Sequence, residues 1–111
     1  MDKCNRYRQL IQQIIQTYCQ LSPSDESLQS LPIFDSIHEQ YLLVRMGWEG
    51  QNRIKRTIIH IQLKNEKIWI EEDWTEDGVA TDFLLAGVPR EDIVLAFHPP
   101  ELRQYTEFAI T

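Results

Sequence analysis

The first 21 residues carry apolar side chains three and four positions apart. This spacing gathers them on one face of an amphipathic helix. We predict that helix over residues 3–21, with an apolar face formed by Tyr7, Leu10, Ile11, Ile14, Ile15, Tyr18 and Leu21. The run Ser22-Pro23-Ser24-Asp25 ends the helix, because proline cannot continue the hydrogen-bond ladder. We expect a polar loop from there to Pro32.

Residues 33–72 change to a pattern rich in β-branched and aromatic residues, interrupted by short polar segments. Such a pattern is typical of strands joined by tight turns. We predict four strands over residues 33–35, 41–47, 53–63 and 68–72, with turns at 36–40, 48–52 and 64–67.

The hairpin formed by the last two strands has one favoured register. With Asn65 and Glu66 at its tip, the isoleucines and Leu63 share a single face, and a slip of one residue would scatter them. The predicted cross-strand pairs are Leu63 with Ile68, Ile61 with Ile70, Ile59 with Glu72, Gln62 with Trp69 and His60 with Glu71.

The preceding hairpin has two possible registers. Its alternation lets Val44 face either Lys55 or Arg56. A β-bulge near the turn Gly47–Gly50 would decide between them, because a bulge shifts the pairing by one residue.

A second helix follows the last of these strands. Asp73 or Thr75 can cap its first turn, and we predict that it continues to about Ala86. Gly87 then fits the left-handed conformation that commonly ends a helix. Pro89 suits the first turn of another short helix.

The stretch Ile93–Phe97 is continuous and apolar. It is either a buried strand or the core of the short helix that starts at Pro89, and its length does not decide between them. Pro99-Pro100 stiffens the chain after it, and we predict one further helical turn over residues 100–103.

Together these elements predict one α+β domain over residues 1–111. A long N-terminal helix packs on a mainly antiparallel sheet of about four strands, with short C-terminal helices and one further strand. No apolar run is long enough to cross a membrane. The N-terminal helix is amphipathic and lacks the continuous apolar core of a signal peptide, so we do not expect secretion.

The two cysteines point to a reducing compartment. Cys4 and Cys19 both fall on the first predicted helix, roughly 22 Å apart at about 1.5 Å per residue, which is too far for a disulfide. Free thiols fit the cytoplasm.

Charge is sorted along the chain, whose net charge is −6. Residues 53–67 hold five cations and one acid, whereas residues 71–92 hold eight acids and one arginine. A protein with this balance is a poor unaided DNA binder. The alternative is that the basic strand Arg53–Arg56 contacts phosphate once a partner masks the acidic side. The acidic residues form either a solvated face that aids solubility or a docking surface for a basic partner.

Candidate chemistry is sparse. The three histidines and two cysteines have no metal-ligand spacing, so we predict no catalytic residue, no metal site and no cofactor. His60 opposite Glu71 is either an acid–base pair or a cross-strand charge pair. The carboxylates of residues 71–78 lack the spacing of a calcium loop, and helix capping by Asp73 and Glu76 explains them more simply.

Three tryptophans flank the predicted turns and sheet edges. Aromatic residues at such places are either lids of the core or anchors of a protein interface. We predict a partner-binding set that comprises Trp48, Trp69, Trp74, His60, Glu71 and Asp73. The alternative is a metal-dependent nuclease or other hydrolase that uses His60, Glu71 and Asp73.

Several short motifs occur in a fixed order along the whole chain. They include Gly47-Trp48-Glu49-Gly50 and the run that starts at Gly87-Val88-Pro89 and continues through Phe97-His98-Pro99-Pro100-Glu101. Further segments are 41–44, 59–61, 67–70, 75–80 and 105–109. On these segments the chain resembles the XisI family, the fdxN element excision controlling factors of cyanobacteria.

The resemblance implies a role in controlling programmed excision of a DNA element during heterocyst development. A separate recombinase would cut and join, and a XisH-like protein of endonuclease fold would be the partner. The resemblance carries no established catalytic residue, so it implies an accessory role in which DNA is reached only through partners. A homo-oligomer is a further expectation, because such a sheet leaves an edge and a face to cover.

Overall fold

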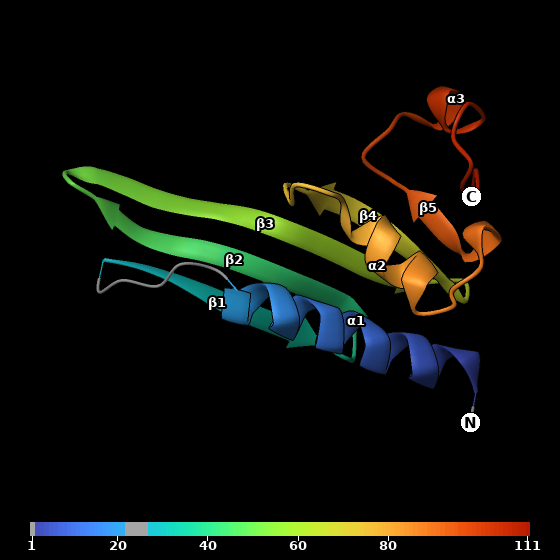
Figure 1. Cartoon of the computed structure of the whole chain (residues 1–111), viewed down its shortest axis with the longest axis horizontal. Coiled ribbons are helices and arrows are strands. Elements are labelled where there is room, and N and C mark those ends of the chain that lie inside the picture. Colours follow the sequence, from blue (N-terminus) through green and yellow to red (C-terminus); the bar gives the residue numbers. More distant parts are fainter. Residues whose placement is uncertain (1, 22–26) are drawn as a thin grey trace.

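The computed structural model of the chain describes residues 2–21 and 27–111. Five strands form one sheet in the order β1-β2-β3-β4-β5, antiparallel throughout except for the parallel pair β4–β5 (Figure 1). The elements in chain order are α1 (Lys3–Leu21), β1 (Leu28–Asp35), β2 (Gln40–Glu49), β3 (Asn52–Lys64), β4 (Lys67–Asp73), α2 (Val79–Leu85), the 3₁₀ helix η1 (Arg90–Asp92), β5 (Ile93–Leu95) and α3 (Pro100–Arg103). This architecture confirms the predicted α+β fold.

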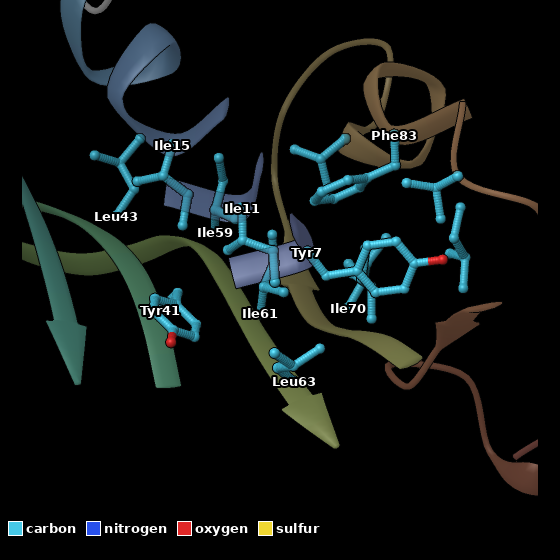
Figure 2. Close-up of a cluster of buried hydrophobic side chains, with 14 residues drawn as sticks. Tyr7, Ile11, Ile15, Tyr41, Leu43, Ile59, Ile61, Leu63, Ile70 and Phe83 are labelled. Carbon is cyan, nitrogen blue, oxygen red and sulfur yellow. The ribbon is translucent and has the colours of Figure 1, made fainter. Parts of the chain in front are cut away.

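Helices α1 and α2 cover the same face of the sheet, and the core lies between them and the strands (Figures 1 and 2). The apolar stripe of α1 forms the helical side of this core through its fully buried residues Tyr7, Ile11 and Ile15. The strands contribute Tyr41, Leu43, Ile59, Ile61, Leu63, Ile68 and Ile70, and α2 adds Val79 and Phe83. No helix in the described part of the chain is long and apolar enough to cross a membrane.

The β3–β4 register is confirmed near the turn and wrong beyond it. Ile61 pairs with Ile70, as predicted, and the three pairs nearer the tip also match. The pairing then shifts between His60 and Ile61, so that His60 pairs with Glu72 and Ile59 with Asp73. Glu71 is the extra residue of this bulge, and the predicted pairs of His60 with Glu71 and Ile59 with Glu72 do not form.

The β2–β3 hairpin is also bulged, at a place that alternation does not reveal. Val44 pairs with Thr57, and the shift lies between Leu43 and Val44. Neither predicted partner of Val44 is therefore correct, and the bulge is not in the turn at residues 47–50. Its extra residue is Ile58, between the paired Thr57 and Ile59.

The first strand starts earlier than predicted, at Leu28. Residues 28–32, expected as loop, pair with β2, and Leu28 lies opposite Gly47. Pro32 is tolerated because β1 is an edge strand. Helix α1 ends at Leu21 as predicted, whereas the Ser22–Asp25 stop lies outside the described residues.

The C-terminal elements test the strand-or-helix alternative for residues 93–97 and the helices predicted around it. Residues 93–95 form a strand, and residues 96 and 97 turn away from it, so the strand alternative holds for the first part of the apolar stretch. Helix α2 begins at Val79, later than predicted, and Gly87 has a φ of +95° after its end. The short helices after Pro89 and over residues 100–103 are confirmed.

Candidate protein-interaction surface

The structure gives Asp73 a structural task. Its Oδ2 accepts a hydrogen bond from the Val79 backbone N–H at 2.8 Å, at the first residue of α2. Its Oδ1 accepts hydrogen bonds from the Thr75 backbone N–H at 2.9 Å and from the Thr75 hydroxyl at 2.6 Å. Both carboxylate oxygens are engaged, and Asp73 caps the first N–H of α2 from the end of β4. The N-cap position itself is Gly78, not Asp73 or Thr75 as predicted.

His60 and Glu71 do not form the pair that suggested acid–base chemistry. The bulge places Glu72 opposite His60, and the His60 Nε2 lies 2.7 Å from Oε1 of Gln40, its neighbour on β2. In the described part of the chain, no group of three or more histidine, cysteine or acidic side chains is placed to hold a metal ion. The geometry that motivated the hydrolase alternative is therefore absent from β3 and β4.

Two of the three tryptophans make intramolecular contacts with cations. Trp69 is 9% exposed, and its indole N–H donates to the Lys64 carbonyl at 3.1 Å. The Lys64 Nζ and the Arg103 guanidinium lie 4.6 Å and 5.6 Å from the centre of its ring. Trp69 thus closes the sheet face next to the C-terminal segment. Trp48 is 50% exposed near the β2–β3 turn, with the Arg53 guanidinium 5.4 Å from its ring centre.

Trp74 is different, because it is exposed and yet fixed. Its side chain is 72% exposed, while its indole N–H donates to Glu72 Oε2 at 2.7 Å. Its backbone N–H donates to the Ile58 carbonyl at 2.9 Å, just where β4 stops pairing with β3. A hydrogen-bonded aromatic side chain of this kind loses little freedom when a partner covers it.

Two surface hollows meet at Trp74. The first, of about 430 Å³, lies over Glu71, Glu72 and Asp73 and reaches Phe97. The second, of about 340 Å³, shares Glu72 and Trp74 and extends along β3. We call the set Ile58, Glu71, Glu72, Trp74 and Phe97 the Trp74 surface. It combines apolar anchors with carboxylates, which suits a partner that is basic around an apolar centre.

The predicted partner-binding set lacked Glu72, Phe97 and Ile58 of this surface. Phe97 is 48% exposed and packs against His98, with ring centres 4.6 Å apart. The Pro99-Pro100 pair two residues later was the one available sign that the strand had ended. Ile58 is a bulge residue whose apolar nature fits either face, so no sequence signal placed it.

A buried ionic network ties α1 to η1. Among the residues that the structure describes, Asp92 is the only buried charged side chain, at 6% exposure. The Tyr7 hydroxyl donates a hydrogen bond to Asp92 Oδ2, and the Lys3 Nζ lies 2.9 Å from the same oxygen.

The two buried groups of this network shift each other's protonation in opposite directions. Burial pushes the pKa of Asp92 upward, but the Tyr7 hydrogen bond and the Lys3 ammonium outweigh it, so the pKa of Asp92 is lowered. Burial, and then the hydrogen bond to the carboxylate, raise the pKa of Tyr7 far above its usual range. Asp92 is therefore an ionised carboxylate that links η1 to Tyr7 and Lys3 of α1.

Comparison with known proteins agrees with this fold. The model of the XisI protein family matches residues 1–110. A XisI-like protein from Anabaena variabilis is 34% identical with a TM-score of 0.93, and the match covers 97% of this chain and 99% of that one.

A second solved structure is more similar in sequence. The fdxN element excision controlling factor XisI from Anabaena variabilis is 43% identical with a TM-score of 0.88, and the match covers 99% of this chain and 100% of that one. No curated protein matches the chain. Because the family model spans nearly all of the sequence, the chain belongs to the XisI family.

Proposed function

We propose that this chain is an accessory protein that controls excision of a DNA element of the fdxN type. The observation that carries the proposal is its membership of the XisI family, together with its likeness along the full chain to an fdxN element excision controlling factor. In this proposal the chain acts by binding other proteins, and its partner is a XisH-like protein of endonuclease fold.

The docking site in this proposal is the Trp74 surface. From the predicted partner-binding set, Trp74, Glu71 and Asp73 line its first hollow. A large exposed aromatic side chain between two hollows is the usual form of an interface hot spot. The neighbouring carboxylates add attraction for a basic partner and speed its approach. Trp48, Trp69 and His60 line neither of these two hollows.

The role is regulatory rather than catalytic in this proposal. His60 is hydrogen-bonded to Gln40, and both oxygens of Asp73 are used by the cap of α2. These contacts give structural tasks to two of the three residues of the hydrolase alternative. Cys4 and Cys19 are free thiols in the structure, which supports a place in the reducing cytoplasm.

Co-expression with a XisH-like protein tests the proposal. We expect the two chains to elute together from a sizing column, with light scattering giving the mass of the complex and of any self-association. Trp74→Ala should weaken the complex about 30-fold, the effect of a hot spot worth about 2 kcal/mol. The matched control is Tyr105→Ala, which removes another exposed aromatic side chain, at 79% exposure, outside the Trp74 surface.

Two outcomes would contradict the proposal. Independent elution of the two wild-type chains would show that the XisH-like protein is not the partner. An equal loss of affinity in Trp74→Ala and Tyr105→Ala would show that the Trp74 surface is not the docking site. Thermal melts of both variants show whether either change merely unfolds the chain.

A further inference from the structure

The β2–β3 hairpin continues beyond the C-terminal end of α1 and beyond the end of β4 (Figure 1). The last pair between β3 and β4 joins Ile59 to Asp73, so within the described part of the chain residues 52–57 of β3 pair only with β2. This part of β3 is therefore a free edge of the sheet. An edge strand presents unpaired backbone groups along with its side chains.

Cations gather on this free edge. Arg53, Lys55 and Arg56 are all exposed, and we call them the cationic edge. Among the described residues, neither Lys55 nor Arg56 has an ion-pair partner. With Arg45 and Glu49 included, residues 44–57 carry a net charge of +3, in a chain whose total is −6.

The cations project on both faces of the edge. Successive side chains of a strand alternate between faces, so Arg53 and Lys55 lie on one face and Arg56 lies on the other. Cross-strand pairing agrees, because Arg53 lies opposite Trp48 and carries its guanidinium over that ring. A flat protein surface would meet only one of these faces. A charged polymer that runs along the edge meets both.

The acidic residues of α2 and η1 lie away from the cationic edge, toward the other end of the molecule, whose longest dimension is 43 Å (Figure 1). The screening length at physiological salt is about 8 Å. Among the described residues, the potential along the cationic edge is therefore set by its own charges, by Glu49 opposite Asn52, and by Glu72, whose Oε2 already accepts the Trp74 indole N–H.

The cationic edge opposes pairing with its own copy. Two such edges in antiparallel contact would bring Arg53, Lys55 and Arg56 against the same cations. A polyanion has the opposite preference. Duplex DNA carries one phosphate per strand every 3.4 Å or so of helix axis. This charge density offers several phosphates to the three long cationic side chains at once.

We infer that the cationic edge binds the phosphate backbone of double-stranded DNA, independently of base sequence. This goes beyond the proposed function, in which DNA is reached only through a partner. Two contacts orient the Arg53 side chain. Its guanidinium lies over the Trp48 ring, and its Nη1 donates to the Gly47 carbonyl at 3.4 Å. Arg56 lines the same hollow as Trp74, so a protein bound at the Trp74 surface would lie beside the bound duplex.

Fluorescence anisotropy with a labelled duplex of roughly two helical turns tests this inference on the full chain. We expect a dissociation constant of about 10⁻⁶ to 10⁻⁴ M. Three phosphate contacts give a slope of about −2.7 in log affinity against log salt, which is about a 20-fold loss between about 50 and 150 mM salt. Lys55→Gln with Arg56→Gln should reduce the slope to about −0.9 and the loss to about threefold.

The matched control is Lys64→Gln with Arg90→Gln. It removes the same charge from two cations that lie outside β3 residues 52–57, and it should leave the slope unchanged. An equal drop in slope for both double variants would overturn the inference, because net charge alone would then explain it. Absence of duplex binding by the wild type, with aggregation of the Lys55→Gln/Arg56→Gln variant, would assign the cations to protection of the sheet edge.

Two competitors identify the class of ligand. Polyglutamate that displaced the duplex at equal charge concentration would overturn the inference in favour of an acidic protein. Tighter binding of a single strand, lost in Trp48→Ala, would overturn it in favour of base stacking. The two proposals can fail separately: Trp74→Ala should lose the protein partner and keep the duplex. Lys55→Gln, at a position that lines neither hollow of the Trp74 surface, should weaken the duplex and keep the partner.

Discussion

Tyr7→Phe removes one oxygen atom from the middle of the core and isolates the buried carboxylate. Tyr7 is 1% exposed, and its hydroxyl donates to Asp92, which is 6% exposed. The phenylalanine ring fills the same space, so the change creates almost no cavity. What it removes is a hydrogen bond to an ionised group that is almost completely buried.

The size of the effect follows from this burial. A hydrogen bond to a charged group contributes about 1.5 to 3 kcal/mol to stability. After the change, Asp92 keeps only Lys3, whose side chain is 43% exposed. We therefore expect the free energy of unfolding to fall by about 2 kcal/mol, or the melting temperature to fall by roughly 8 °C for a domain of this size.

The pH dependence of the loss identifies its cause. The pKa of Asp92 is lowered in the folded state, below a value of about 3.9 in the unfolded chain. Its stabilisation is therefore fully present above the unfolded value and is lost as the pH falls through the folded one. The difference between wild type and Tyr7→Phe should be full at pH 7 and should shrink as the pH falls below about 4.

Urea titrations at several pH values, followed by circular dichroism, measure this difference. Tyr105→Phe is the control, because Tyr105 is 79% exposed and its hydroxyl should contribute less than about 0.5 kcal/mol. A Tyr7→Phe loss that stayed constant from pH 7 to pH 3 would refute the reasoning, since the carboxylate would then have no part in it.

Two further changes test the backbone and the cap of α2. Gly47→Ala should destabilise the fold by about 2 to 4 kcal/mol in urea titrations, because φ is +147° and an added Cβ would lie 1.9 Å from the Ser27 carbonyl oxygen. Gly50→Ala, with nothing within 4 Å, should cost only about 1 kcal/mol for its φ of +64°, and equal losses would disprove the close-approach argument. Asp73→Ala should cost about 1 kcal/mol by removing the bond to the Val79 N–H, and full stability by thermal melting would mean that α2 needs no such cap.

The elements that could be predicted are those whose stability is local. The apolar residues of α1 recur at helical spacing, and the helix covers the predicted residues up to Leu21. The tip of the β3–β4 hairpin also held, because its isoleucines must all face one core. In both cases the spacing of the apolar residues indicates directly which face of the element is buried.

The elements that could not be predicted depend on contacts distant in sequence. Ile58 and Glu71 are bulge residues, and an isoleucine or a glutamate is compatible with either face of a strand. Residues 28–32 have no strong alternation and become a strand only because β2 offers an edge to pair with. Such pairings are decided by the partner strand, which the local pattern does not contain.

The Trp74 surface was predictable only where its residues are neighbours in the sequence. The carboxylates and Trp74 stand in one short sequence block, so their grouping needed no tertiary information. Phe97 joins them because β5 runs parallel to β4 and the Ala96 N–H donates to the Ile70 carbonyl at 2.8 Å. That contact sets the path of the chain at the end of β5. It depends on β5 lying beside β4 in the sheet, which the local sequence pattern does not show.

The motif Gly47-Trp48-Glu49-Gly50 contains two glycines that the backbone requires and a tryptophan that it does not require. Gly47 is required by the close approach of Ser27, and Gly50 by the left-handed turn. Trp48 has no such requirement, since half of its side chain is exposed and its ring contacts Arg53 of the cationic edge. The fold thus accounts for the glycines. The inferred DNA binding would give Trp48 a role as well, because its ring orients the first arginine of the cationic edge.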